Sequence, residues 1–271
     1  RHLLSSKRWA NHFTQSSLLA LATGLATLST MKRDSEAQAR EILNVAAKVL
    51  RQALDIRAEQ LSDSVRILAA DFGFRRAVAT AEQETIESVL ANHGNRINAS
   101  LMLLLGTDGN LLASSETSIT AADIAPLFNQ TQGKSTEPVA DIQQLAGQPY
   151  QLVLAPVKAP NLIAHVGMGF PLDGPLAQQI KGITGLDISF TGIRDGQHRI
   201  GNSTLSSVHQ QQLHDLLSAL FAQTNTVQSS PQQDYVSVAV PLDQQQQLWA
   251  VQHLSNQRWL SSYQQLRSQL F

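Results

Sequence analysis

The chain contains no cysteine among its 271 residues, which excludes disulfide bonds, thiolate metal sites and cysteine nucleophiles. It also lacks an excess of charge of either sign, since 20 Lys and Arg are balanced by 21 Asp and Glu and the formal net charge is −1. Proteins that bind nucleic acid usually concentrate basic residues on one surface. The composition therefore predicts no nucleic-acid partner.

The N-terminal segment, residues 1–33, contains no Asp, Glu, Lys or Arg between Trp9 and Met31. A membrane-spanning helix needs about 20 mostly apolar residues, and this span is long enough although Ser, Thr, Gln, Asn and His dilute it. Basic residues before the span would keep its start in the cytoplasm. We expect a membrane anchor that places the residues after about 33 in the periplasm. The apolar region of a secretory signal and a soluble amphipathic helix are the alternatives.

Residues 34–72 lack glycine and proline and are rich in Ala, Leu, Glu, Gln and Arg, which predicts one long helix. The helix either begins at a capping box near its first residues or continues from the preceding span. Apolar residues recur every three or four positions, interrupted at Arg57. Such a stripe serves as a spine for packed domains, as a dimer seam, or as both. We expect a homodimer to use Leu54, Leu61 and Leu68.

Two shorter helices are expected after Gly73, which we predict to end the long helix. Thr80 stands at the N-cap position of a possible capping box, so we expect the second of these helices to begin there. Gly94 is expected to end this helix. Asp71 and Arg75 could form an anion site near a helix start. A salt-bridged joint between the long helix and the next is the simpler interpretation.

Asn92, His93 and Arg96 stand at the end of the last of these helices, where a histidine can bond free carbonyls and complement the helix dipole. No Ser or carboxylate lies at a spacing that would complete a catalytic triad or an acid pair. We therefore interpret the three residues as structural and predict no catalytic site. His209 and His214 are five residues apart on a predicted helix and do not share a face, so no metal site is predicted.

Residues 97–172 change to strand-like patterns. An Asp-Gly turn at 108–109 lies between two apolar runs and predicts a hairpin. A helix follows, and three further strands are expected over 138–145, 150–158 and 161–170. This order of helices, hairpin, helix and antiparallel strands predicts an α+β fold with a single sheet.

Residues 173–255 repeat this order, which indicates an internal duplication. The second Asp-Gly turn, at 195–196, follows the first by 87 residues, and Tyr235 and Pro241 follow Tyr150 and Pro156 by 85. The second copy has no evident counterpart of the strand at 138–145. A final helix is expected over 256–271.

The layout and the motifs DFGFRRAV, TIESVLANHGNRI and TDGNLLAS resemble the bacterial double Cache sensor domain, a PAS-like extracytoplasmic module of membrane receptors. The motifs are most similar to the subgroup that precedes histidine kinase, GGDEF or EAL output domains. Asp71, Arg75, Asn92, His93 and Arg96 belong to them as structural residues. The resemblance implies a basic segment and possible anchor at 1–33, a long helix and helical connection at 34–96, a membrane-distal Cache domain at 97–172, a membrane-proximal Cache domain at 173–255, and a C-terminal helix at 256–271 leading towards a second span or output domain.

In this family the ligand, where one is known, lies in the membrane-distal domain. The resemblance places Tyr150, Lys158 and His165 on the strands that line that cavity, and Met168 would give it an apolar wall. A lysine and a histidine favour a small polar or anionic ligand. No Arg-x-Trp-Tyr run appears in the distal half, which argues against the best-described mode of amino-acid sensing.

The resemblance implies the sensory region of a bacterial inner-membrane protein, with no cofactor and no enzyme activity of its own. Its output, cyclic-di-GMP turnover or a kinase, would lie outside this chain. The alternative is a ligand-free dimerisation or protein-interaction module of the cell envelope. An envelope hydrolase is disfavoured because no nucleophile or acid pair is evident.

Overall fold

The computed structural model describes the backbone of residues 2–132, 137–145, 147–194, 196–222, 228–229 and 235–255, with most of their side chains from residue 29 onward. The predicted helix at 256–271 lies outside the described residues, as do most side chains of the predicted membrane anchor. Within the described part, no helix carries a stretch long and apolar enough to cross a bilayer.

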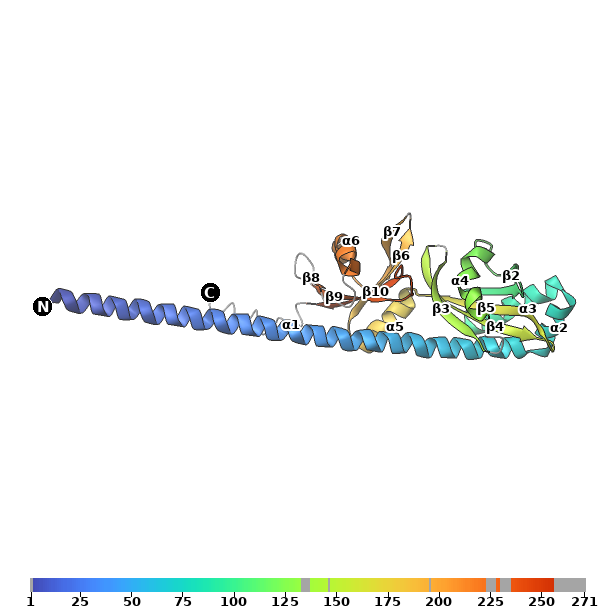
Figure 1. The fold of residues 1–271 in the computed structure, drawn as a ribbon, viewed down its shortest axis with the longest axis horizontal. Coiled ribbons are helices and arrows are strands. Elements are labelled where there is room, and N and C mark those ends of the chain that lie inside the picture. The colour runs from blue at the N-terminus through green and yellow to red at the C-terminus, as the bar shows by residue number, and fades with distance from the viewer. Residues whose placement is uncertain are drawn as a thin grey trace.

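One helix, α1 (His2–Ala70), runs alongside both sheets and extends past them towards the N-terminus (Figure 1). Its 69 residues correspond to roughly 100 Å of helix. The helix continues through the predicted capping box near its start. It ends at Ala70 because Asp71 adopts an extended conformation, with ψ at 130°, and caps the next helix. The break therefore precedes Gly73, which lies inside α2 (Phe72–Thr80).

The boundary between α2 and α3 (Gln83–Ile97) differs from the sequence prediction. Thr80 is the last residue of α2, and Ala81 reverses the chain with φ at 54°. α3 then starts after Glu82 and ends at Asn98, which has φ at 55°. Two non-glycine residues thus take the left-handed conformations for which sequence reasoning would look to glycine.

Gly94, predicted to close α3, lies within it and is buried. A Cβ atom at this position would lie 2.7 Å from Cγ of Met102, which belongs to the first strand. Gly94 therefore allows α3 to pack closely on the sheet and does not terminate the helix.

The first domain, called distal below because it lies farther from the N-terminus of α1 than the second, proximal domain (Figure 1), contains a five-stranded antiparallel sheet in the order β2-β1-β5-β4-β3. Apolar residues of α1, α2 and α3 cover one face of this sheet, and α4 covers the other. The elements are β1 (Leu101–Gly106), β2 (Leu111–Ser114), α4 (Ala121–Thr131), β3 (Val139–Leu145), β4 (Gln148–Lys158) and β5 (Leu162–Pro171).

The second domain repeats this topology, with the order β7-β6-β10-β9-β8, so the predicted duplication and fold class are confirmed. α1 and α5 pack on one face and α6 on the other. A two-residue strand, β8, stands where the distal sheet has β3, which corrects the expectation of no counterpart. The elements are α5 (Gly174–Thr184), β6 (Asp187–Arg194), β7 (Gln197–Ser203), α6 (Ser207–Ala222), β8 (Gln228–Ser229), β9 (Tyr235–Pro241) and β10 (Trp249–Ser255).

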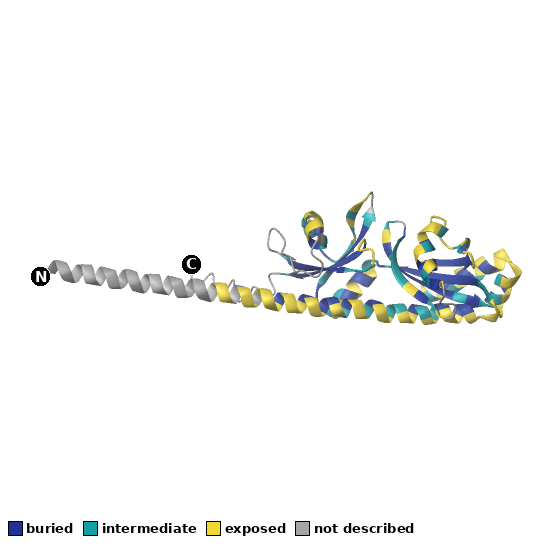
Figure 2. Cartoon of the chain, viewed as in Figure 1, coloured by how far each residue is buried: buried dark blue, intermediate teal, exposed yellow. Residues whose placement is uncertain are grey.

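The inner face of α1 is buried against both sheets, whereas its outer face is exposed (Figure 2). Besides apolar packing, each sheet bonds α1 through one buried glutamine. Gln151 of β4 donates to the carbonyl of Leu54 at 2.8 Å, and Gln252 of β10 donates to the carbonyl of Ala46 at 3.2 Å. Each sheet is therefore held at a defined position along the helix.

Candidate functional site

The face of the distal sheet that α4 covers carries one buried histidine. His165 of β5 is 4% exposed, and its ring meets the ring of Phe128 of α4 edge-on, with centroids 5.3 Å apart. Its Nδ1 atom has no hydrogen-bond partner among the described residues. Burial lowers the pKa of the imidazole, so the ring is neutral at neutral pH.

Leucine side chains fill the space beside His165. Gly167 and Gly169 follow it on the same face of β5, and a Cβ atom on Gly167 would lie 2.6 Å from methyl groups of both Leu103 and Leu154. The glycines thus make room for leucines of the neighbouring strands. The result is a packed apolar surface with His165 at one end.

The four residues predicted to bind ligand do not form one cluster. Lys158 lies two positions beyond Pro156, the partner of His165 on β4, so it is near His165. Tyr150 lies eight residues from Lys158 on the same strand, about 26 Å away at 3.3 Å per residue. Met168 belongs to the opposite face, in the core shared with α1. Among the four, only Lys158 and His165 stand at neighbouring positions of the paired strands β4 and β5.

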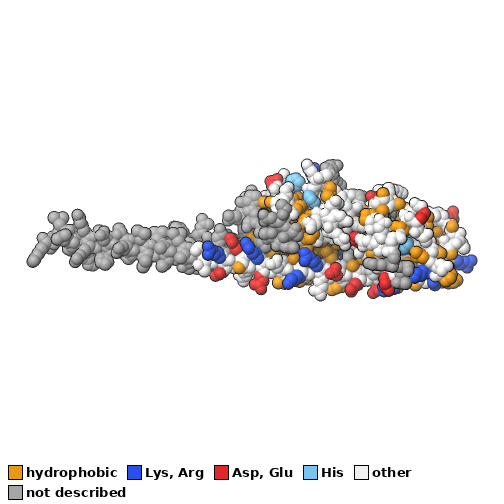
Figure 3. Space-filling view, in the orientation of Figure 1, with side chains coloured by type: hydrophobic (Ala, Val, Ile, Leu, Met, Phe, Trp, Pro, Cys, Tyr) orange, Lys and Arg blue, Asp and Glu red, His pale blue; other side chains and the backbone are white. Residues whose placement is uncertain are grey.

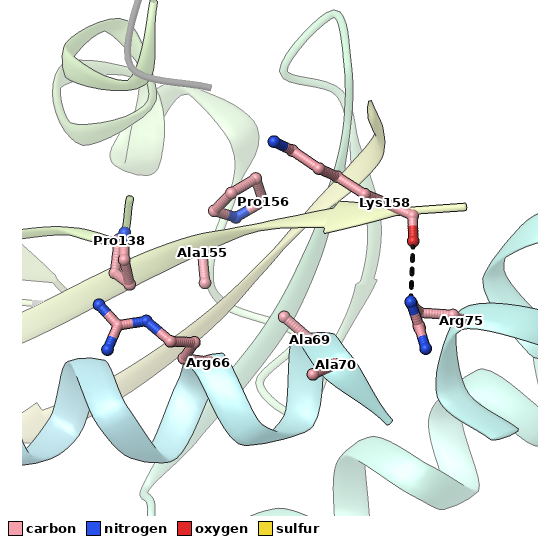
Figure 4. Close-up of a pocket in the computed structure, with 8 residues that line it drawn as sticks. All are labelled: Arg66, Ala69, Ala70, Arg75, Pro138, Ala155, Pro156 and Lys158. Atoms are coloured by element: carbon pink, nitrogen blue, oxygen red, sulfur yellow. Dashed lines mark hydrogen bonds between the residues drawn. The ribbon is translucent and has the colours of Figure 1, made fainter. Parts of the chain in front are cut away.

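A cavity of about 200 Å³ lies where β4 continues past the start of β3, between α1, α2 and the sheet (Figure 4). Arg75 donates from Nη1 to the carbonyl of Lys158 at 3.5 Å, so it caps the backbone of β4. Arg66 pairs with Asp63 at 2.8 Å and with Glu137 at 3.0 Å. The Lys158 ammonium points away from the alanines of α1 (Figure 4). The cations here mainly stabilise the end of the sheet.

The other family-motif residues gather at a second cavity, of about 240 Å³, between the last turn of α1 and α3. Asp71, Asn92, His93 and Arg96 line it. Asp71 also accepts a hydrogen bond from the backbone N–H of Phe74 at 2.7 Å and so caps α2. The predicted salt-bridged joint is absent, because Asp71 and Arg75 form no salt bridge with each other or with another described residue.

The predicted dimer stripe is occupied by the chain itself. Leu54 packs against the proximal sheet, and Leu61 and Leu68 pack against the distal sheet, all with 9% exposure or less. These side chains are therefore the spine of the monomer and do not form a seam between copies. Arg57, between the two sets, places its guanidinium carbon 5.7 Å from the centre of the Phe170 ring.

The proximal sheet carries a buried polar chain that sequence reasoning missed. On the face covered by α6, His253 of β10 bonds Ser189 through Nε2 at 3.0 Å and Ser237 through Nδ1 at 2.8 Å. Ser189 also bonds Ser203 at 2.7 Å. We call these four residues the His253 chain. It crosses the adjacent strands β7, β6, β10 and β9.

Two amide side chains connect the domains, and neither was predicted. Gln144 of β3 accepts from the backbone N–H of Ile193 at 2.7 Å and donates to the carbonyl of the same residue. Asn202 of β7 donates to the carbonyl of Leu172 at 3.1 Å. The turn between β3 and β4 therefore rests on β6.

The described residues contain no group of three or more His, Cys, Asp or Glu side chains that could hold a metal ion. Two tandem antiparallel sheets on one helix, each with a helix over its outer face, define a tandem sensory architecture. A family model described as the double sensory domain of a two-component sensor kinase, dCache_3, matches residues 36–251. The chain belongs to this family, which is a sensory module and not an enzyme. The resemblance inferred from the motifs is thereby confirmed.

Solved structures share the fold at low sequence identity. The periplasmic domain of LuxQ from Vibrio cholerae superposes with a TM-score of 0.57 at 11% identity, covering 79% of this chain and 100% of that domain. The sensory domain of the Campylobacter jejuni chemoreceptor Tlp3 gives 0.51 at 14% identity, covering 86% of this chain and 98% of its own. No curated protein sequence matches the chain.

Proposed function

We propose that this chain is the extracytoplasmic sensory region of a membrane-bound signalling protein, anchored through residues 9–31 and periplasmic after about residue 33. The output would be cyclic-di-GMP turnover or a kinase in another part of the protein. The family match over both domains carries the proposal. The long α1, which extends past both sheets, supports it because such a helix would lead from the sensor to a membrane (Figure 1).

The ligand of the distal domain is proposed to be small and polar or anionic, and to bind on the face under α4 at His165 and Lys158. Nδ1 of His165 lacks a partner in the described structure, and a buried polar atom is costly unless it is hydrogen-bonded. A ligand group that bonds this atom would remove that cost. Binding would require α4 and the leucines around Gly167 to separate.

A thermal-shift screen of metabolites against the 271-residue chain tests this proposal. A ligand present at about 100 times its Kd should stabilise the protein by about 2.7 kcal/mol. His165→Leu should abolish the response, because leucine fills the space without a hydrogen-bonding group. Ile163→Leu, on the other face of β5, is the matched control and should respond like the wild type.

The leucine packing beside His165 favours a second candidate, a ligand-free interaction module of the envelope. In that case no metabolite would stabilise the chain across a broad library, and His165→Leu would raise stability by removing an unbonded buried group. Those two results together would replace the ligand-sensing proposal.

A homodimer is proposed through the outer face of α1, because the inner stripe is buried. Ile42, Val45 and Ile56 are 38%, 54% and 47% exposed, and with Val49 they follow spacings of three, four and seven. This is the pattern of a narrow helix–helix seam between parallel copies anchored in one membrane. Charged side chains flank it along the surface of α1 (Figure 3). We therefore propose that a second copy of this chain packs against the outer face of α1.

Disulfide cross-linking in membranes tests the seam cleanly, because the chain has no native cysteine. Val45→Cys and Ile56→Cys should each give a covalent dimer under mild oxidation. Leu61→Cys, on the buried stripe, is the control and should not. Equal cross-linking at all three positions, or none at the outer two, would contradict this arrangement.

A further inference from the structure

The cavity between α1 and α3 lies at the end of the molecule farthest from the N-terminus (Figure 1). One wall is a single stripe of α3, with Val89, Asn92, His93 and Arg96 at helical spacings of three and four. The other wall is the end of α1, with Ile67, Leu68 and Asp71. We call this space the α1–α3 cleft.

The cleft is lined by one acidic and one basic side chain that do not form an ion pair with each other. Asp71 and Arg96 are both exposed, and no ion pair within 4.0 Å joins either of them to any residue that the structure describes. Asp71 uses Oδ1 for the α2 cap, which leaves Oδ2 for a further donor. The cleft therefore presents an anion and a cation that are too far apart to pair directly.

Polar and apolar groups complete the lining. Nε2 of His93 is buried and has no partner among the described residues. Burial and, after it, the nearby Arg96 lower the pKa of this imidazole, opposed by a hydrogen bond with the backbone of Ser64 and by Asp71. Asn92 has only a long contact, 3.5 Å, to Ser88. Leu68 is buried and Val89 half-buried, so the floor of the cleft is apolar.

The size of the cleft limits what it can hold. A water molecule takes about 30 Å³ in the liquid, so about 240 Å³ accommodates a compact molecule of about eight non-hydrogen atoms. A ligand with a single charge would leave either Asp71 or Arg96 without a counter-charge. A ligand with both charges would bridge them.

We propose that the α1–α3 cleft is a binding site for a small zwitterion, separate from the face under α4. The carboxylate of the ligand bonds Arg96 and His93, its cationic group bonds Asp71, and its apolar part rests on Leu68 and Val89. Arginine and carboxylate form short charge-assisted hydrogen bonds of well-defined geometry. Because α1 supplies one wall, an occupied cleft connects α3 directly to the helix on which both sheets are mounted.

The test is calorimetric titration of the full chain with l-valine and l-alanine, up to about 10 mM, which is high enough to reveal millimolar affinity. Isovalerate and isobutylamine, which carry one charge each, are the matched probes. At least one zwitterion should bind, and both single-charge probes should bind at least about tenfold more weakly. No binding by either zwitterion, or equal binding by a single-charge probe, would overturn the proposal.

Variants then locate the site. Arg96→Gln and Asp71→Asn should each weaken zwitterion binding at least about tenfold. Asparagine is as good an N-cap as aspartate, so Asp71→Asn keeps the start of α2 intact. Arg76→Gln, an exposed substitution on α2 outside the cleft, should bind like the wild type. Unchanged zwitterion binding in both cleft variants would contradict the assignment of the site to the α1–α3 cleft.

His165→Leu separates this site from the face under α4. Zwitterion binding that survives His165→Leu and is lost in Arg96→Gln supports the cleft whether or not the distal face binds a ligand of its own. The reverse pattern would assign the zwitterion to the distal face and overturn the cleft proposal, while leaving the sensory function in place.

Discussion

Acidification from about pH 6.5 to about pH 3 is expected to lower the free energy of unfolding by about 4 kcal/mol through His253 alone. Burial lowers the pKa of this imidazole from 6.5 to about 3, with Asp187 opposing the shift and His209 adding to it. In the unfolded chain the ring takes up a proton near pH 6.5, whereas the folded chain resists protonation until about pH 3. The unfolded state therefore binds more protons in this range, and stability falls as the pH falls.

The hydrogen bonds of the His253 chain explain why the imidazole stays in its neutral form. A neutral imidazole has one donor and one acceptor nitrogen, so one of Ser189 and Ser237 accepts from it and the other donates to it. A protonated ring would donate on both sides and would require one serine to reverse its bond. No carboxylate bonds the ring directly in the described structure.

Denaturant unfolding at a series of pH values measures this effect. His253→Gln should be less stable than the wild type at pH 7.5 but should lose less stability on acidification. His214→Gln, an exposed substitution on α6, is the control and should follow the wild-type curve. His93, His165 and His198 also have lowered pKa values, mainly because of burial, so the decisive quantity is the difference between curves. An unchanged pH dependence in His253→Gln would contradict the prediction.

Gln144→Leu is expected to uncouple the two domains and to cost about 2 kcal/mol. The leucine fills a similar volume but leaves both the N–H and the carbonyl of Ile193 without their amide partner. A fully buried group that loses its partner costs about 1–3 kcal/mol, and because these two bonds are half-buried we expect about 2 kcal/mol for both together. Gly192, whose Cβ would lie 3.3 Å from the carbonyl of Gly147, shows how closely the two domains approach here.

Scanning calorimetry distinguishes coupling from general stability. The wild type should unfold in one transition, and Gln144→Leu should separate it into two, with the proximal domain unfolding at the lower temperature. Gln143→Leu, the adjacent position on β3, is the matched control and should keep one transition. A single transition in Gln144→Leu, merely shifted in temperature, would mean that the amide adds stability without joining the domains.

The sequence predicted the parts of the fold that depend on local patterns. The long glycine-free run and the first Asp-Gly turn reflect periodicity and turn chemistry, and the structure has a helix and a hairpin there, although the helix ends at Ala70 and not at Gly73. The helix ends near Thr80 and Gly94 were misplaced because Ala81 and Asn98 adopt positive φ, which glycine normally supplies. The close approach of Met102 to Gly94, a tertiary contact, explains the glycine instead.

Site residues were harder to predict because their partners are distant in sequence. Gln144 and Ile193 are 49 residues apart, and Ser189 and His253 are 64 apart. No local spacing marks such pairs. The cleft was an exception, since Asp71, Asn92 and His93 stand in short motifs, although their common cavity became apparent only once α3 was packed beside α1.

The strand registers show that the two copies have diverged in chemistry at equivalent positions. His253 stands where the distal copy has Gly169, and Ser189 and Ser237 stand where it has Leu103 and Leu152. One copy thus seals the face under its helix with leucine, and the other joins its strands with side-chain hydrogen bonds. The two copies of this surface therefore differ in polarity at these three positions, although apolar side chains fill much of both.

The glutamines that bond α1 restrict how this molecule can move. The carbonyls of Ala46 and Leu54 are eight residues apart, about 12 Å along the helix axis, and each is bonded to a different sheet. Sliding α1 by half a turn would break both bonds together and leave two buried amides unsatisfied, at about 1–3 kcal/mol each. The helix therefore acts as a fixed-length spacer. Displacement towards the membrane must carry helix and sheets as one body, or bend the helix between its two anchor points, Ala46 and Leu54.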